Sequence, residues 1–126
     1  MENKVLTGKI LEAAFEVSNG LGAGFVESVY QKALMIALTD KGLKADAEVP
    51  IEVEFRGSKV GRFFADIIVD DLVIVELKAV DMFAKEHFAQ ILNYLKASGL
   101  KTGLIINFGR PKVEYRRFDN RFPSSG

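Results

Sequence analysis

The sequence has no cysteine or tryptophan, only one histidine and three prolines, and no net charge across its 126 residues. Without cysteine, the chain has no disulfide, no thiol nucleophile and no cysteine-bound zinc or iron–sulfur site. A single histidine excludes a multi-histidine metal site within one chain. Any metal site must therefore be built mainly from carboxylates, which favour hard cations such as magnesium or manganese.

Charge of one sign and long apolar runs are also lacking. Seventeen basic and seventeen acidic residues cancel, so nucleic-acid binding would need a local basic patch. No apolar run approaches the roughly 20 residues that cross a bilayer, and the N-terminal stretch mixes charged with apolar residues, unlike a signal peptide. We therefore expect no membrane partner and a cytoplasmic location.

The composition is that of a folded globular chain, with 48% hydrophobic and 27% charged residues. The length predicts a single domain over residues 1–126, with a frayed tail over residues 120–126. No internal repeat or low-complexity run divides it.

Two hydrophobic periods alternate along the chain. Helical spacing predicts helices over residues 4–18, 26–40 and 82–97, with Asn19-Gly20 ending the first. Period-two alternation and continuous apolar runs predict strands over residues 49–55, 61–69, 72–80 and 103–108, and residues 113–118 are a candidate for a last, more exposed strand. The order α-α-β-β-β-α-β, with or without this final strand, predicts an α/β fold with one parallel pair in a mixed sheet, and Pro50 indicates an edge strand or a strand entrance.

Three charged residues within apolar runs mark a candidate site. Glu76 and Lys78 are two apart, so they point to the same side of one strand. Asp66 lies on the preceding strand, and a two-residue turn at Asp70-Asp71 would place it on the opposite face from Glu76. An odd-length loop or a bulge would bring the two carboxylates together. The alternative for Glu76 and Lys78 is an ordinary surface ion pair.

Polar residues on the predicted helices are further candidates. Glu27 follows a glycine-rich loop on the first turn of a helix, where a carboxylate also suits the helix dipole. Tyr30 lies on the same face and is expected mainly to pack. Gln90 and Tyr94 share one face of the third helix, where Tyr94 is equally suited to the core. His87, one turn before Gln90, is a candidate contact to phosphate or to another site residue.

These motifs resemble those of one nuclease superfamily. Asp66 followed by Glu76-Leu77-Lys78 is similar to the D…(D/E)-x-K core of the PD-(D/E)XK nuclease superfamily, and Gly24 to Tyr30 resembles the signature of its GxxExxY protein family. Gln90-x-x-x-Tyr94 resembles a motif of the RecB-type exonuclease branch. The resemblance runs from about residue 11 to 117. The proline that names the superfamily is absent, and Ala65 stands beside Asp66.

The resemblance implies a fold, a reaction and a set of site residues. The fold is a three-layer, restriction-endonuclease-like core around a mixed β-sheet. The reaction is metal-dependent hydrolysis of phosphodiester bonds in nucleic acid, with DNA favoured over RNA. Asp66 and Glu76 would bind Mg²⁺ or Mn²⁺, with Glu27 as a third or water-mediated ligand. Lys78 would act as electrostatic stabiliser or base, and Gln90 would hold Lys78, a water or a phosphate. The candidates for substrate contact or indirect support are Tyr94, His87 and Tyr30.

Other functions remain open at this stage. A non-catalytic module that binds nucleic acid or protein would suit the small size, and a structural calcium domain is disfavoured because calcium prefers more oxygen ligands and no lysine. Ten phenylalanines are many for a small interior, which predicts a symmetric homodimer. The basic residues near the C-terminus suit a phosphate backbone or a solvated face, and they are Arg110, Lys112, Arg116, Arg117 and Arg121.

Overall fold

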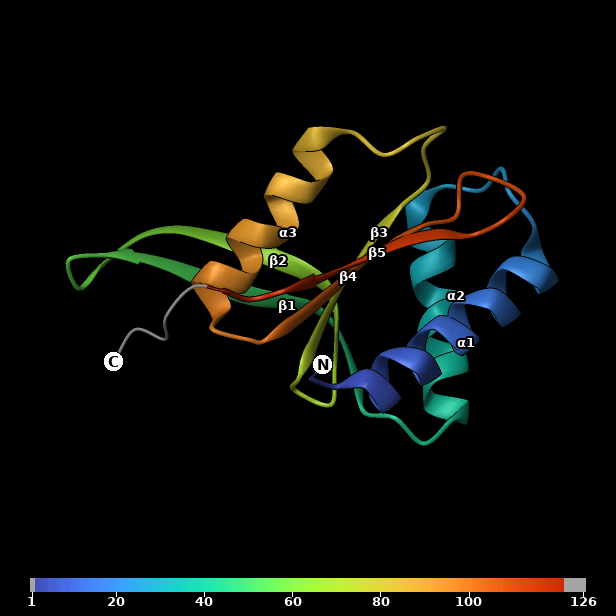
Figure 1. The fold of residues 1–126 in the computed structure, drawn as a ribbon, viewed down its shortest axis with the longest axis horizontal. Coiled ribbons are helices and arrows are strands. Elements are labelled where there is room, and N and C mark those ends of the chain that lie inside the picture. The colour runs from blue at the N-terminus through green and yellow to red at the C-terminus, as the bar shows by residue number, and fades with distance from the viewer. Residues whose placement is uncertain (1, 122–126) are drawn as a thin grey trace.

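A computed structural model describes residues 2–121, which form three helices and five strands in the predicted order (Figure 1). The helices are α1 (Lys4–Leu21), α2 (Glu27–Asp40) and α3 (Lys85–Ser98). The strands are β1 (Ala45–Phe55), β2 (Ser58–Val69), β3 (Val73–Lys78), β4 (Thr102–Asn107) and β5 (Glu114–Asp119).

The strands form one mixed sheet in the order β1-β2-β3-β4-β5. All neighbouring strands are antiparallel except β3 and β4, which run parallel on either side of the α3 crossover. The α/β fold class, the element order and the single parallel pair predicted from the sequence are confirmed. β1, which carries Pro50, lies at an edge of the sheet.

Helices cover both faces of the sheet, which gives the expected three layers. One core cluster joins α1 and α2 to strand residues such as Ile67, Val75 and Leu104. The other joins α3, through Tyr94 and Leu95, to the opposite face of the sheet. Figure 1 shows the separation, with α1 and α2 on one side of the crossing strands and α3 on the other. The alternation of side chains along β3 explains both contacts, because residues of odd and even number point to opposite faces.

Several element boundaries differ from the sequence prediction, and three of the differences concern the ends of α1, α3 and β1. α1 continues through Asn19-Gly20 and ends at Gly22, which has a φ of 72° and donates its amide to Ser18 O. α3 begins at Lys85 rather than Met82, so residues 79–84 form a loop. β1 begins four residues before Val49, because these residues pair with the end of β2 although they alternate only weakly in hydrophobicity.

The loop between β2 and β3 has three residues, Asp70 to Leu72, because Val69 pairs with Val73. Asp70 and Asp71 adopt φ values of 53° and 57°, a conformation that aspartate tolerates better than most side chains. The last pair of this ladder is Ile67 with Val75, so Asp66 and Glu76 are the next residues along the two strands. The two carboxylates therefore lie on the same side of the hairpin, which is the outcome that the sequence left open.

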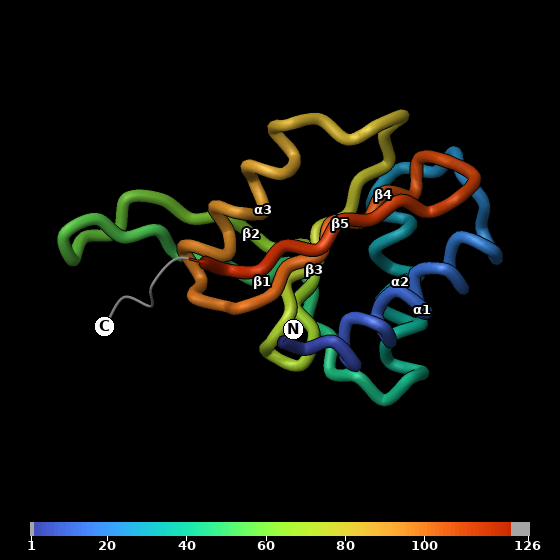
Figure 2. The backbone as a smooth tube through the Cα atoms, viewed as in Figure 1, coloured from blue at the N-terminus to red at the C-terminus, as the bar shows by residue number. Residues whose placement is uncertain are grey.

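The hairpin of β1 and β2 extends well beyond the rest of the sheet. β2 pairs with β3 only from Ile67 to Val69, so its earlier residues pair with β1 alone. We call this two-stranded extension, residues 49–65, the arm. It turns at Arg56-Gly57, whose φ values of 51° and 80° are those of a tight two-residue hairpin turn. Figure 2 shows the arm projecting away from α1 and α2.

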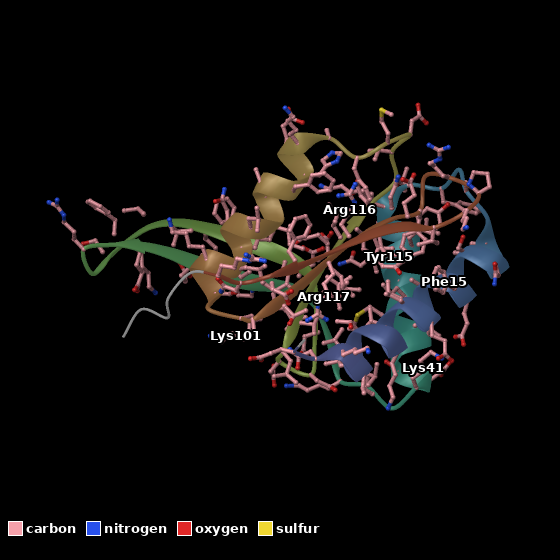
Figure 3. The ribbon with its side chains drawn as sticks, in the orientation of Figure 1. Phe15, Lys41, Lys101, Tyr115, Arg116 and Arg117 are labelled. Carbon is pink, nitrogen blue, oxygen red and sulfur yellow. The ribbon has the colours of Figure 1, made fainter. Side chains whose placement is uncertain are left out.

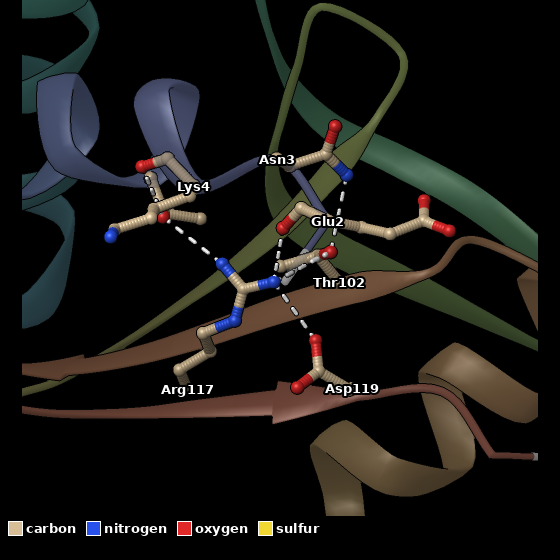
Figure 4. Close-up of polar contacts among 7 residues, drawn as sticks. Glu2, Asn3, Lys4, Thr102, Arg117 and Asp119 are labelled. Carbon is tan, nitrogen blue, oxygen red and sulfur yellow. Dashed lines mark hydrogen bonds and ion pairs between the residues drawn. The ribbon is translucent and has the colours of Figure 1, made fainter.

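Arg117 ties the start of the chain to the last two strands (Figure 4). Its guanidinium, only 13% exposed, donates to Asp119 Oδ1 at 2.9 Å, to Thr7 Oγ1 at 3.1 Å and to the backbone oxygen of Glu2. Thr102 Oγ1 also accepts from it, at 3.5 Å. Arg117 is therefore a structural residue rather than a member of a phosphate-binding surface.

The chain remains anchored just beyond β5. The backbone amide of Asn120 donates to Lys101 O, and its side-chain amide donates to the backbone oxygens of Leu95 and Leu100. The predicted tail therefore does not begin at Asn120, and residues 122–126 lie outside the described residues. None of the helices between residues 2 and 121 is long and apolar enough to span a bilayer.

We expect Arg117→Met to destabilise the fold by about 1–3 kcal/mol, because it removes charge-assisted hydrogen bonds from a largely buried group. Arg116→Met is the matched control. Arg116 lies on the other face of β5, over the Phe88 ring at 5.3 Å (Figure 3), and its loss should change stability by well under 1 kcal/mol. Chemical denaturation of the two variants checks this, and equal destabilisation would contradict the structural role of Arg117.

Candidate active site

The candidate site lies where β2 and β3 separate. Beyond the Ile67–Val75 pair the backbone ladder stops, and two carboxylates take its place. Asp66 Oδ2 accepts the backbone amide of Leu77 at 2.7 Å, while Glu76 Oε1 accepts the backbone amide of Asp66 at 3.4 Å. The backbone of each strand is thus held by a side chain of the other, and this exchange brings Asp66 and Glu76 together.

Glu76 is strongly perturbed in this position. It is only 3% exposed, and burial together with the neighbouring negative charge of Asp66 raises the pKa of Glu76 to about 9. Lys78 lowers it, but less strongly. Without a bound cation, Glu76 therefore holds its proton at neutral pH.

Lys78 belongs to a chain of hydrogen bonds that leads to α3. Its Nζ donates to Gln90 Oε1 at 3.1 Å, and Gln90 Nε2 donates to Tyr94 Oη at 3.1 Å. Burial and the nearby Glu76 carboxylate raise the pKa of Tyr94. Lys78 and Gln90 are thus in direct contact, and Tyr94 supports Gln90 from within the core.

A cavity of about 590 Å³ opens on the other side of Asp66. Glu27 on the first turn of α2 reaches it, as do Gln31 one turn later and Glu48 on β1. Gln31 Nε2 donates to Glu48 Oε1 and to the backbone oxygen of Asp66, both at 2.9 Å. The residues that line the cavity are Phe25, Val26, Glu27, Ser28, Gln31, Glu48, Asp66 and Ala79.

The predicted metal ligands do not all meet. Asp66 and Glu76 are in contact, and Glu27 shares the cavity with Asp66. No group of three or more acidic or histidine side chains within residues 2–121 is arranged to hold a metal ion. The geometry therefore supplies a carboxylate pair with a third carboxylate across a cavity.

Comparisons with known proteins show the superfamily of the chain. The family model described as PD-(D/E)XK nuclease superfamily matches residues 4–118. The chain belongs to this superfamily. No curated protein matches the chain.

A solved structure shares the fold. The crystal structure of SSO0001 superposes with a TM-score of 0.60 at 17% sequence identity, covering 76% of this chain and 50% of that one. The chain thus spans about half the length of that protein, and the likeness concerns the fold alone.

Two residues singled out in the sequence, Tyr30 and His87, make structural contacts in this PD-(D/E)XK domain. Tyr30 is fully buried and stacks on Phe108 at 4.7 Å. Its hydroxyl donates to Gly22 O and accepts from the Phe25 amide, so it fixes the loop that leads to Glu27. His87 Nδ1 accepts the backbone amide of Ala84 at 3.0 Å and thereby caps the start of α3.

The sequence interpretation missed three residues that shape the site. Gln31 lies one helical turn after Glu27 and could have been found by its spacing. Glu48 precedes the predicted strand, and its φ of 52° gives no signal in the sequence. Asn107 is fully buried, and its side chain bonds the backbone of Val80 through both N–H and C=O. It holds the segment that follows Lys78.

Three of the five C-terminal basic residues make separate local contacts. Arg117 is committed to the contacts described above. Arg116 lies over Phe88, and Arg110 donates to Asp81 O and pairs with Glu114 at 3.4 Å. The contacts of these three arginines favour local structural roles over a shared phosphate-binding track.

The raised pKa of Glu76 predicts how stability depends on pH without metal. The folded protein binds a proton that the unfolded chain releases above its ordinary pKa of 4.5, so stability should fall as pH rises from about 5 to 9, by at most about 1.4 kcal/mol per pH unit. Thermal melts in EDTA across this range measure the effect. Glu76→Gln should flatten the dependence, and an unchanged slope in this variant would contradict the assignment.

The backbone at Gly109 lies very close to the backbone of Val80, the segment that follows Lys78. A Cβ at this position would lie 2.2 Å from Val80 O and 2.4 Å from Val80 N, so Gly109→Ala should destabilise the fold by about 1–3 kcal/mol. In the control Gly61→Ala, the nearest atom is Val53 Cβ at 3.8 Å, and the melting temperature should barely change. If both variants melt like the wild type, the close approach is not a real constraint.

Proposed function

We propose that this chain is a Mg²⁺- or Mn²⁺-dependent nuclease that hydrolyses phosphodiester bonds, with DNA preferred over RNA. One observation carries the proposal. Asp66 and Glu76 meet at the separation of β2 and β3, and Lys78, two residues further along β3, donates to Gln90. Two carboxylates, an ammonium and an amide at one break in a sheet suit the hydrolysis of an anionic ester.

The donor set fits a hard divalent cation. Asp66 and Glu76 offer carboxylate oxygens and lie so close that burial and mutual repulsion keep a proton on Glu76. A cation would replace this proton and relieve the repulsion. Glu27, across the cavity, is the proposed third or water-mediated ligand. When bound, the cation would stabilise the negative charge that develops on the phosphate and lower the pKa of a water.

The remaining residues of the site would bind the phosphate or the attacking water and orient the side chain of Lys78. The Nζ of Lys78 carries donors beyond the one used by Gln90 and can hold a phosphate oxygen or the attacking water. Gln90 fixes the direction of the ammonium, and Tyr94 fixes Gln90. In hydrolysis the water oxygen bonds to phosphorus, the bond to the leaving oxygen breaks, and one proton passes from the water to the leaving group. Lys78 serves this transfer as electrostatic stabiliser or as base.

The proposal extends to the family, the domain organisation, the location and the oligomeric state of the protein. We assign the chain to the GxxExxY family because Gly24, Glu27 and Tyr30 stand at the spacing of its signature and Tyr30 fixes the loop before Glu27. We further propose that residues 1–126 act as one domain, in the cytoplasm and as a homodimer. Thirteen large hydrophobic side chains within the described residues are exposed, which supports a contact between copies.

A non-catalytic module that binds nucleic acid or protein is the second candidate. It is favoured by the lack of a three-group metal cluster within residues 2–121. Metal-dependent cleavage separates the two candidates, because a binding module has no such activity to lose.

Lys78→Met should lose cleavage by roughly 100-fold or more, the scale of one positioned catalytic group, and keep its melting temperature. It retains most of the apolar stem and removes only the charge. Cleavage of labelled single- and double-stranded substrates is measured over a titration of magnesium or manganese. Calorimetry should find the manganese affinity retained in this variant and lost in Asp66→Asn, which keeps an oxygen for the Leu77 amide.

Lys9→Met is the control, since Lys9 is exposed on α1, and it should cleave like the wild type. Cleavage by Lys78→Met at the wild-type rate would show that the activity does not arise at this site. A wild type that neither cleaves nor binds manganese would leave the binding module as the function.

A further inference from the structure

The arm carries large apolar side chains that remain between two-fifths and two-thirds exposed. Phe55 is 60% exposed, Val60 63%, Phe63 42% and Phe64 49%. The base of the arm packs on α3 through Ile51 and Ala65, whereas rings exposed to solvent contribute little to the stability of the hairpin. Rings left in solvent on a projecting hairpin are typical of a binding surface.

Cations lie among these rings. The Arg56 guanidinium lies 4.9 Å from the centre of the Phe55 ring. Lys59 and Arg62 are also exposed on the arm, and Arg62 pairs with Glu52 at 2.7 Å. Residues 49–65 hold three basic and two acidic residues, in a chain whose total charge is zero. At the tip, Lys59 stands opposite Glu54 in the strand register, and Arg56 at the turn has no acidic residue opposite it, so Arg56 carries the excess positive charge of the arm.

The arm leads directly into the candidate site. Phe64 lies two residues before Asp66 on the same strand. The Phe63 ring packs against Tyr94 with ring centres 5.2 Å apart, and Tyr94 is bonded to Gln90, the partner of Lys78. Phe63 and Phe64 are consecutive in β2 and point to opposite faces of the arm, so each face of the arm leads to residues of the candidate site.

We propose that the arm binds single-stranded nucleic acid, with bases stacked on its phenylalanines and phosphates held by Arg56 and Lys59, and delivers the strand to Asp66. The inference rests on the proposed nuclease function and names its substrate class. Aromatic rings interspersed with cations suit a single strand, because every unpaired base offers a face for stacking. In a duplex the bases are already stacked on one another. A second copy suits the tip less well, since a symmetric contact there would set its cations against themselves.

Binding is measured without cleavage, by fluorescence anisotropy in EDTA. The probes are a labelled DNA single strand, its duplex and an RNA single strand of the same sequence. Phe55→Ser and Phe64→Ser should each weaken single-strand binding by at least about 5-fold, the lower end of one base–aromatic stack. Phe15→Ser is the control, because Phe15 is 41% exposed on α1, where it meets Tyr115 (Figure 3), and it should bind like the wild type.

The charges are tested by the dependence of affinity on salt. Arg56→Gln and Lys59→Gln should each reduce the slope of log affinity against log salt by about 0.7, the value for one phosphate on a single strand. Lys9→Gln, an exposed charge on α1, should leave the slope unchanged. Sedimentation of every variant at the same concentrations follows the oligomeric state.

Each result decides the inference. Weaker binding by the arm variants alone, with the single strand bound more tightly than the duplex, supports it. Tighter binding of the duplex, no binding by the wild type, or equal loss in Phe15→Ser overturns it. Phe64→Ser that dissociates a dimer with affinity unchanged would make the arm an interface between copies instead. Cleavage assays separate the two proposals. Arm variants that cleave with unchanged KM overturn the arm alone, whereas strand binding without any metal-dependent cleavage overturns the nuclease and leaves the arm.

Discussion

The length of one loop fixes the candidate site. Three residues separate β2 from β3, and this odd number puts Asp66 and Glu76 on the same side of the hairpin. A two-residue loop in the same position would pair Asp66 with Val75 and turn the two carboxylates to opposite faces of the hairpin. Asp70 and Asp71 adopt the left-handed backbone that the three-residue loop requires. Both the pairing of the carboxylates and the raised pKa of Glu76 depend on this register.

The break in the sheet has a use beyond placing two acids. Where the ladder stops, backbone amides are left to be satisfied, and Asp66 and Glu76 accept them. These carboxylates therefore hold the strands apart at a fixed distance and keep further acceptor positions for other ligands. The arm begins at the same point, because β2 no longer has β3 beside it. One interruption of hydrogen bonding thus produces both the candidate site and the arm that leads to it.

Hydrophobic patterning predicted the order of the elements, since helical and strand periods differ and the continuous apolar runs 73–75 and 104–106 are buried on both faces of the sheet. The contact between Lys78 and Gln90 was predicted only from the family resemblance. Hydrophobic patterning says nothing about it, because the two residues lie on different elements. Some of the missed boundaries lie where hydrophobic signals are weak, as at the start of β1. Others lie where two nearby glycines are both able to end a helix, as Gly20 and Gly22 are near the end of α1. Glu48 could not be found, because its importance comes from a backbone angle and from a hydrogen bond to Gln31. Such tertiary contacts are not encoded in local pattern.

Arg117 joins the backbone of Glu2 to the last strand, and β4 borders the strand that carries Lys78. The hydrogen bonds of Arg117 therefore form only when the first residues of α1 and the last strand, β5, are both in place. During synthesis on the ribosome, β3 emerges before its parallel neighbour β4, and the backbone of Val80 has no Asn107 to hold it until β4 has been made. The candidate site can therefore assemble only after α3 and β4 have been synthesised.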